Sequence, residues 1–135
     1  MENKRTVYAA LEGVEGSGKT TLIKEVESCL KAKNYKVLTV REPGTTEVAE
    51  EIRSLIMNNE LSSKAEMLSF ILARQDLIDR IIKPSIGRYD FILSDRSYVS
   101  SMVHQGHCLG LGMDYVKDIN NSIIDIKPHK IYFID

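Results

Sequence analysis

Apolar residues follow two spacings that alternate along the chain, and this alternation predicts the order of strands and helices. Short runs of mainly apolar residues are typical of buried strands, and they occur at residues 7–11, 36–40, 91–93 and 130–134. Apolar residues three and four positions apart are typical of helices, and this spacing covers residues 20–33, 47–57, 63–82, 98–103 and 114–124. Strands that alternate with helices favour a parallel sheet with helices on both faces, joined by right-handed crossovers. We therefore expect a three-layer α/β fold.

The longest predicted helix, residues 63–82, carries signals at both ends. Ser63 and Glu66 have the spacing of a capping box, in which each side chain bonds the backbone N–H of the other residue. Pro84 follows the last apolar residue, and a proline usually ends a helix before it. We therefore expect this helix to begin at Ser63 and to stop before Pro84.

Length and composition indicate one domain and argue against two classes of protein. The 135 residues are 43% hydrophobic, which is enough for one core, so we expect a single domain over residues 1–135. The net charge of −1, from 18 basic and 19 acidic residues, argues against a nucleic-acid-binding protein, which needs a basic excess. No apolar run is long enough to cross a bilayer, and residues 1–6 are polar and charged. We therefore expect neither a transmembrane helix nor a signal peptide.

The two cysteines lie far apart and lack the spacing of metal ligands. Cys29 falls on the apolar side of the predicted helix 20–33, where a free buried thiol is the usual state. Cys108 has no nearby partner in the sequence. A reducing, cytoplasmic setting is the simplest interpretation of this cysteine pattern.

The clearest motif lies between the first predicted strand and the first predicted helix. Residues 13–20, Gly-Val-Glu-Gly-Ser-Gly-Lys-Thr, fit the pattern G-x-x-x-x-G-K-[ST] of a phosphate-binding loop. The glycines let backbone N–H groups turn toward a phosphate, and the helix start adds a partial positive charge. Lys19 can then reach the β- and γ-phosphates of a nucleotide, and the Thr20 hydroxyl can bind Mg²⁺. A carboxylate such as that of Glu15 is electrostatically unfavourable beside a phosphate, so Glu15 either faces solvent or has another role, such as accepting a hydrogen bond from a sugar hydroxyl.

Charged residues also follow the second and third predicted strands. Arg41 follows the second strand, and Arg53 comes twelve residues later. Two arginines suit a dianionic phosphate, because guanidinium binds oxyanions through paired hydrogen bonds, although Arg53 by itself is equally typical of an exposed helix. Asp95 follows the third strand and can hold Mg²⁺ directly or through water. Its neighbour Arg96 can neutralise the charge of a phosphate.

The predicted helix 63–82 carries a further pair of candidate binding residues. Phe70 and Arg74 are one turn apart, so they project from the same face of the helix. An aromatic ring and a guanidinium together can hold a nucleobase, by stacking and by donating to a carbonyl oxygen. A place for Phe70 in the core is about equally consistent with the sequence.

Taken together, these segments resemble thymidylate kinases, and the resemblance extends from one end of the chain to the other. The matched elements occur in the order and near the spacing of that family. They are Glu12-Gly-Val-Glu-Gly-Ser-Gly-Lys-Thr-Thr21, Arg41-Glu42-Pro43-Gly44, Arg53, Phe70-x-x-x-Arg74, Asp95-Arg96 and Gln105-Gly106. The resemblance implies a P-loop fold and the transfer of the γ-phosphate of ATP to thymidine monophosphate, with Mg²⁺.

The resemblance also implies a role for each matched residue toward ATP and the metal ion. Lys19, Glu15 and Arg96 would be the catalytic residues. Mg²⁺ would be held by Thr20 and Asp95. ATP would be bound by Gly13, Gly16, Ser17, Gly18, Lys19, Thr20 and Thr21.

Thymidine monophosphate would be bound by a second group of residues that the resemblance identifies. Phe70 would stack on thymine, Arg74 would hydrogen-bond the base, and Glu15 would contact the 3′-hydroxyl of the deoxyribose. Arg96, with Arg41 or Arg53, would hold the acceptor phosphate. The other substrate-binding residues are Glu42, Ser101 and Gln105. Family members usually form homodimers, and the apolar faces of 47–57 and 63–82 would suit either an interface or the core.

The chain departs from the family pattern in four places. Thr45 follows Gly44 where the family usually has a second glycine, and His104 precedes Gln105 where the family commonly has a tyrosine that excludes a 2′-hydroxyl. An arginine usually found shortly afterwards is absent from residues 107–110. The last residues, 131–135, resemble the strand before the family's mobile lid. In family members whose phosphate loop has no internal arginine, as at residues 14–17 here, the lid carries the catalytic arginine. We therefore expect the lid and the fifth strand to be missing and some apolar surface to be uncovered.

Two other functions stay open on the sequence. The segments Asp95-Arg96-Ser97 and Glu42-Pro43 also resemble deoxynucleoside kinases, so the acceptor could be an uncharged nucleoside or another deoxynucleoside monophosphate. The second alternative is a protein that binds nucleotides without turnover, which the missing lid would favour.

Overall fold

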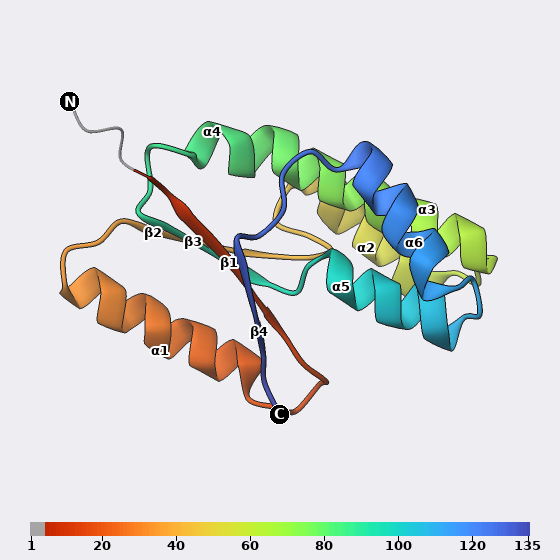
Figure 1. Ribbon diagram of the computed structural model, residues 1–135, viewed down its shortest axis with the longest axis horizontal. Coiled ribbons are helices and arrows are strands. Elements are labelled where there is room, and N and C mark those ends of the chain that lie inside the picture. The colour runs from red at the N-terminus through yellow and green to blue at the C-terminus, as the bar shows by residue number, and fades with distance from the viewer. Residues whose placement is uncertain (1–4) are drawn as a thin grey trace.

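Four parallel strands form one sheet at the centre of the molecule (Figure 1). The computed structural model describes residues 5–135, so residues 1–4, which are part of the polar start used to predict the absence of a signal peptide, lie outside it. The strands, in spatial order, are β2 (Val37–Arg41), β3 (Phe91–Asp95), β1 (Val7–Glu12) and β4 (Lys130–Phe133). All four strands lie at or within one or two residues of the apolar runs in the sequence.

The register of the three central strands brings their carboxyl ends together at one edge of the sheet. Asp95, the last residue of β3, is paired with Leu11 of β1 on one side and with Arg41 of β2 on the other. The residues that follow these strands therefore emerge side by side. This edge is where parallel α/β sheets bind ligands.

Helices cover both faces of the sheet, which confirms the three-layer α/β fold (Figure 1). Helix α1 (Lys19–Ala32) lies alone on one face and contacts β1, β2 and β3. The other helical segments gather on the opposite side. They are α2 (Glu47–Asn58), α3 (Ser63–Leu77), η1 (Ile78–Ile82), α4 (Lys83–Ser85), α5 (Tyr98–Ser101), η2 (Met102–Cys108) and α6 (Met113–Ile123). The segments η1 and η2 are π-helical turns.

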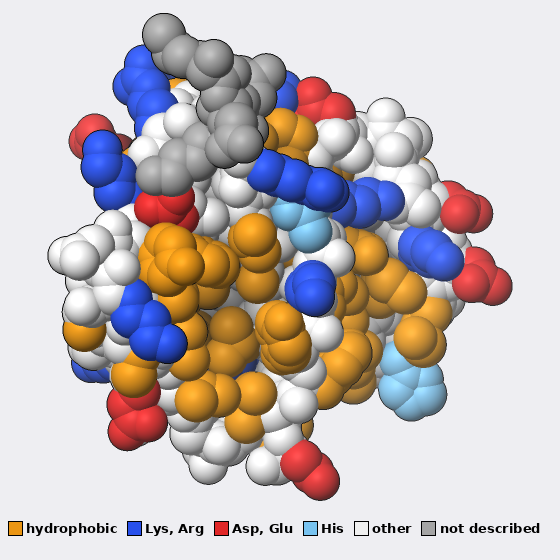
Figure 2. All heavy atoms as spheres, turned by 60° about the vertical axis from the view of Figure 1, so that its left-hand side comes forward, with side chains coloured by type: hydrophobic (Ala, Val, Ile, Leu, Met, Phe, Trp, Pro, Cys, Tyr) orange, Lys and Arg blue, Asp and Glu red, His pale blue; other side chains and the backbone are white. Residues whose placement is uncertain are grey.

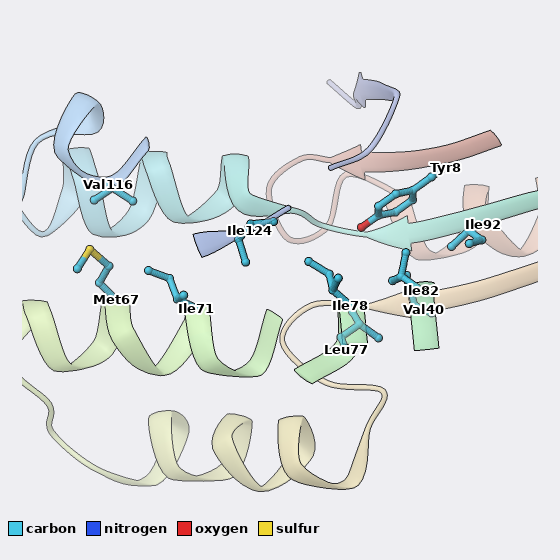
Figure 3. Close-up of a cluster of buried hydrophobic side chains, with 10 residues drawn as sticks. All are labelled: Tyr8, Val40, Met67, Ile71, Leu77, Ile78, Ile82, Ile92, Val116 and Ile124. Atoms are coloured by element: carbon cyan, nitrogen blue, oxygen red, sulfur yellow. The ribbon is translucent and has the colours of Figure 1, made fainter. Parts of the chain in front are cut away.

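Successive residues of β1 point to opposite faces, so the sheet divides the core into two clusters. Tyr8 belongs to the larger cluster, which also includes Ile92 of β3 and Val116 of α6 (Figure 3). Its other members are Val40, Met67, Ile71, Leu77, Ile78, Ile82 and Ile124. Ala9, the next residue of β1, packs beneath α1 with Val37 and Leu93. Each fully buried aliphatic side chain stabilises the fold by roughly 1.5–3 kcal/mol, so the larger cluster dominates the core.

The ends of the longest helix differ from the sequence prediction. The capping box at Ser63 is wrong, because Ser62 is the N-cap and its hydroxyl accepts from the N–H of Ala65 at 3.3 Å. The helical path also continues through Pro84 in α4 instead of stopping before it. A proline ring clashes with the carbonyl four residues earlier in a regular α-helix, and the wider π-turn of η1 comes just before this position.

The expected burial of Cys29 is also wrong, because its side chain is exposed. The residues of α1 that pack on the sheet are Ile23, Val26 and Leu30. Cys29 is six residues from Ile23, which is about 240° around a helix of 3.6 residues per turn. It therefore lies off the buried stripe, although the apolar spacing appeared to include it.

Apolar side chains are exposed in several places. Figure 2 shows a group of them on one face of the molecule, with lysines and arginines among and around them. On β4, Tyr132 is 51% exposed and Phe133 is 71% exposed.

Among residues 5–135, no helix has the length and apolar character that a bilayer crossing needs.

Candidate active site

The loop between β1 and α1 has the backbone form of a phosphate cradle. Gly16 and Gly18 have φ angles of 81° and 87°, which favour glycine because other residues are strained there. Gly18 is the N-cap of α1, so the first free N–H groups of the helix face this loop. The Ser17 hydroxyl is buried and has no partner within the protein. The cradle therefore offers N–H and O–H donors that a bound phosphate would satisfy.

Lys19, Thr20 and Asp95 come together at the end of the loop. The Nζ of Lys19 forms an ion pair with Oδ1 of Asp95. The Thr20 hydroxyl donates to Oδ2 of the same carboxylate at 3.4 Å. Lys19 is only 8% exposed, so its charge depends on this partner. Lys19 and Thr20 are 76 and 75 positions from Asp95 in the sequence, and the pairing of β1 with β3 brings them together.

Two cavities meet at this edge of the sheet. The smaller has a volume of about 420 Å³ and is lined by the loop from Val14 to Thr21 and by Asp95. The larger has a volume of about 630 Å³ and extends between the ends of α2, α3 and η2. Five residues line both cavities, namely Val14, Glu15, Glu42, Arg53 and Arg96. A ligand in one cavity would thus lie next to a ligand in the other.

The three arginines at this edge differ in their partners. Nη1 of Arg96 donates to the Ser100 hydroxyl at 3.2 Å, and Nη1 of Arg53 donates to the carbonyl of Pro43 at 3.0 Å. Arg41 lines only the smaller cavity, and its guanidinium is held by Glu50 through contacts of 2.8 to 3.1 Å. Of the two arginines proposed to assist Arg96, the Arg53 side chain makes one hydrogen bond within the protein and the Arg41 side chain makes three.

Arg74 lies beneath the larger cavity and does not line it. Its side chain is 3% exposed, and its Nε donates to Oε1 of Glu42 at 2.5 Å. Nη1 donates to Oδ1 of Asn120 at 2.6 Å, and Nη2 donates to the Ser101 hydroxyl at 3.0 Å and to the Ser97 carbonyl at 3.3 Å. Four of its five N–H groups are therefore bound within the protein. Ser101 is likewise buried under this arginine, outside the cavity lining.

Burial controls the electrostatics of the Glu42 carboxylate. Its side chain is 5% exposed, and this burial raises the pKa of Glu42, while the adjacent Arg74 lowers it and Glu12 raises it further. Burial also raises the pKa of Tyr8 strongly, and the charge of Glu42 adds to that effect. Arg74 therefore balances a group of buried acidic side chains.

The larger cavity is also lined by residues suited to a planar polar ligand. Phe70 is half-buried and lines the cavity, as does the exposed His104. Gln105 also lines it, is 0% exposed, and neither atom of its amide has a partner. An unpaired buried amide costs roughly 1–3 kcal/mol, so Gln105 points to a polar ligand or an ordered water.

The sequence prediction missed Glu66, which lines the same cavity as Phe70 and Gln105. It lines the cavity, and its Oε2 is buried without a partner. Glu66 is four residues before Phe70, so the two share a helix face. The same helical spacing that linked Phe70 to Arg74 would have found it.

Two local features of η2 accompany the buried position of Gln105, namely its π-helical turn and the glycine that follows at position 106. A π-turn widens the helix and re-aims its side chains, and η2 is π-helical over Met102–Cys108. A Cβ on Gly106 would lie 2.8 Å from Cα of Met113, which is closer than real side chains come. The Gln-Gly pair is thus explained by the close approach of α6 to η2.

Comparison with known proteins gives one consistent result. The sequence model of the thymidylate kinase family matches residues 11–135. The chain is 37% identical over 132 residues to a thymidylate kinase of Thermosipho africanus (strain TCF52B), and 39% identical over 132 residues to one of Acholeplasma laidlawii (strain PG-8A). These matches cover 96% of this chain, and 66% and 65% of the respective relatives.

A solved structure agrees with the sequence relatives. The crystal structure of a thymidylate kinase from Ehrlichia chaffeensis superposes with a TM-score of 0.85 at 33% sequence identity. The superposition covers 97% of this chain and 75% of that chain. The similarity therefore extends over almost all of the fold described above.

Proposed function

The chain belongs to the thymidylate kinase family, and we propose that it transfers the γ-phosphoryl group of ATP to thymidine monophosphate, giving thymidine diphosphate. One observation carries the proposal. The phosphate cradle and the larger cavity share the walls formed by Glu15, Arg53 and Arg96. A donor nucleotide and an acceptor nucleotide in adjoining cavities would have their phosphates side by side, which is the arrangement that direct phosphoryl transfer needs.

The smaller cavity takes the phosphates of ATP. The N–H groups at the start of α1 and the unpartnered Ser17 hydroxyl supply donors, and Lys19 supplies the positive charge. The glycines of residues 13–18 and Thr21 complete the loop. Binding to ATP would draw Lys19 from the carboxylate of Asp95 toward the phosphates.

The residues present also suit Mg²⁺. The hydroxyl of Thr20 and the carboxylate of Asp95 face each other, and Mg²⁺ prefers such oxygen ligands together with substrate phosphates. Among residues 5–135 no cluster of three or more His, Cys, Asp or Glu side chains could hold a metal ion, which accords with a site completed by ATP. When bound, Mg²⁺ neutralises phosphate charge and orients the phosphates.

The larger cavity takes thymidine monophosphate. Phe70 offers a ring for the base to stack on, and Gln105 offers an unpaired donor and acceptor for the edge of the base. Arg74 lies beneath the cavity and keeps one N–H on Nη1 without a partner, so a hydrogen bond to the base would need its guanidinium to move toward the cavity. Glu15 accepts a hydrogen bond from the deoxyribose 3′-hydroxyl.

The reaction requires that negative charge be neutralised while two phosphates approach. An oxygen of the acceptor phosphate attacks the γ-phosphorus, the bond to the β,γ-bridging oxygen breaks, and ADP leaves. Arg96 holds the acceptor phosphate together with Arg53, which makes fewer hydrogen bonds within the protein than Arg41 does. Lys19 balances the charge on the leaving phosphates. Positioning and charge neutralisation are the chain's main contributions, because the transfer needs no covalent intermediate on the protein.

A coupled assay of ADP release tests this function. Purified residues 1–135 are given Mg²⁺-ATP and thymidine monophosphate, with Lys19→Ala as the blank. Deoxyguanosine, deoxycytidine and uridine monophosphates and free thymidine run in parallel. Turnover on thymidine monophosphate that is absent from the blank is the expected result. Turnover on thymidine instead would assign a nucleoside kinase, and calorimetric binding of thymidine monophosphate without turnover would assign a binding protein. If the chain neither turns over nor binds thymidine monophosphate, the proposal is refuted.

The proposal includes a homodimer. Five apolar side chains on α2 and α3 are more than a third exposed, namely Val48, Leu55, Met57, Leu68 and Leu72. An apolar surface on packed helices is typical of a protein interface. Light scattering after gel filtration should give twice the mass of the chain, and Leu72→Lys should shift the protein toward the monomer. A cytoplasmic location stays a prediction from the sequence.

A further inference from the structure

Arg96 has an unusual backbone conformation that the surrounding chain holds in place. Its φ is 74°, a left-handed conformation that is strained for a residue with a Cβ. Its N–H donates to the carbonyl of Leu11 at 2.9 Å, and its own carbonyl accepts from the Ser94 hydroxyl at 2.8 Å. Strain of this kind persists where neighbours fix it, and it is often found at functional sites.

The carboxylate of Glu12 anchors the turn that follows Arg96. Glu12 ends β1 and is 4% exposed. Its Oε1 accepts from the N–H and the hydroxyl of Ser97 at 2.7 and 2.6 Å, and from the N–H of Ser100 at 3.3 Å. Its Oε2 accepts from the Ser100 hydroxyl. All four donors belong to the turn and the start of α5, so this buried charge is satisfied by that segment.

The Ser100 hydroxyl connects Glu12 to the guanidinium of Arg96. A hydroxyl has one proton to donate and two lone pairs that accept. Its proton goes to Glu12, so a lone pair faces Arg96, whose Nη1 donates to Ser100 Oγ at 3.2 Å. Without the carboxylate the hydroxyl could rotate and turn its proton toward the guanidinium. The negative charge of Glu12 therefore fixes the direction of both hydrogen bonds, from Arg96 to Ser100 and from Ser100 to Glu12.

We infer that Glu12 and Ser100 are positioning residues that hold the Arg96 guanidinium at the junction of the two cavities. The inference rests on the proposed function, in which Arg96 holds the acceptor phosphate. Glu12 and Ser100 act through Arg96, because the hydroxyl that Glu12 orients is the one that the Arg96 side chain donates to. The sequence pattern left both residues without a role.

A double-mutant cycle separates positioning from general damage to the fold. Ser100→Ala should lower kcat/KM for thymidine monophosphate about tenfold, and Glu12→Gln about tenfold to hundredfold. Arg96→Ala should lower it about 10²–10³-fold. In the Arg96→Ala background, Ser100→Ala should change kcat/KM less than about twofold, because the group it acts through is gone. An equal loss in both backgrounds would overturn the inference.

The matched control is Ser69→Ala. Ser69 is also a half-buried serine, and its hydroxyl donates to the Ala65 carbonyl at 2.8 Å within α3. This variant should keep the activity of the parent chain. A tenfold loss in Ser69→Ala would mean that serine truncation damages this fold generally, and it would overturn the reading of Ser100→Ala.

A spectroscopic measurement decides the inference even if the chain has no turnover. The Nε–H signal of Arg96 in an NMR spectrum is assigned by its loss in Arg96→Lys. It should move toward the position of solvent-exposed arginines in Ser100→Ala and Glu12→Gln, and stay in place in Ser69→Ala. An unmoved signal in Ser100→Ala refutes the positioning, and a moved signal with unchanged kcat/KM refutes its role in the reaction. Absence of turnover and of thymidine monophosphate binding in the parent chain would refute only the proposed function.

Discussion

Removing one partner of the buried ion pair between Glu42 and Arg74 should cost far more stability than removing one partner of the exposed pair between Glu50 and Arg41. Both pairs join a glutamate to an arginine, but the side chains are 5% and 3% exposed in the first pair and 40% and 51% exposed in the second. Removing one partner of a buried pair leaves a charge without compensation and costs about 3–5 kcal/mol. An exposed pair contributes at most about 1 kcal/mol.

Glutamine substitutions test this difference with little change in side-chain shape. Glu42→Gln should lower the free energy of unfolding by about 3 kcal/mol, near the lower end of the range, because the amide oxygen still accepts from Arg74. Glu50→Gln should lower it by at most about 1 kcal/mol. A domain of this size has a total stability of roughly 5–15 kcal/mol, so the first loss is easily resolved by urea unfolding at pH 7.

A second substitution checks that the loss arises from the pair itself. Arg74→Met alone should cost about 3–5 kcal/mol, because it leaves Glu42 charged and buried. The double variant Glu42→Gln with Arg74→Met should cost at least about 2 kcal/mol less than the sum of the single losses. Additive losses, or a Glu42→Gln loss no larger than that of Glu50→Gln, would refute the argument.

Three further predictions follow from single contacts. Hydrogen bonds from the Thr45 N–H and, next in size, from Arg41 lower the pKa of Glu50 from its usual 4.5. The stability difference between the parent chain and Glu50→Gln should therefore be complete above about pH 4.5 and vanish as the pH falls through the pKa of Glu50 in the folded chain. A difference that grows as the pH is lowered, measured by urea unfolding, would contradict this. Gly106→Ala should destabilise the chain by about 1–3 kcal/mol, because its Cβ would lie 2.8 Å from a backbone carbon; an unchanged urea midpoint would contradict the close approach of α6. Phe70→Ala should weaken thymidine monophosphate binding by about 5- to 150-fold in calorimetry, which corresponds to roughly 1–3 kcal/mol of stacking, and should leave ATP affinity unchanged; an equal loss for ATP would argue against stacking on the acceptor base.

Local patterns in the sequence predicted the strands, the helices and the phosphate loop. Each of these depends on neighbours in the chain, such as the two-residue period of a buried strand or the glycines that a left-handed turn requires. The same local signals misjudged the ends of the helix 63–82. A serine one residue earlier could cap the helix equally well, and a π-turn allowed the chain to continue through Pro84.

Only the tertiary structure decided the partners of the charged residues. Glu42 and Arg74 are 32 residues apart, and Glu12 and Ser97 are 85 apart, so no local spacing links them. The sequence identified Arg41, Arg53 and Arg96 as candidates for binding phosphate, but the position of Glu50 determined that Arg41 forms an ion pair with it. The physical reason is that a charge takes its partner from whichever elements the sheet register brings to the same edge. The sequence by itself identified most of the residues proposed to carry the chemistry, and the packing of the strands and helices determined which of them line the cavities and which lie beneath them.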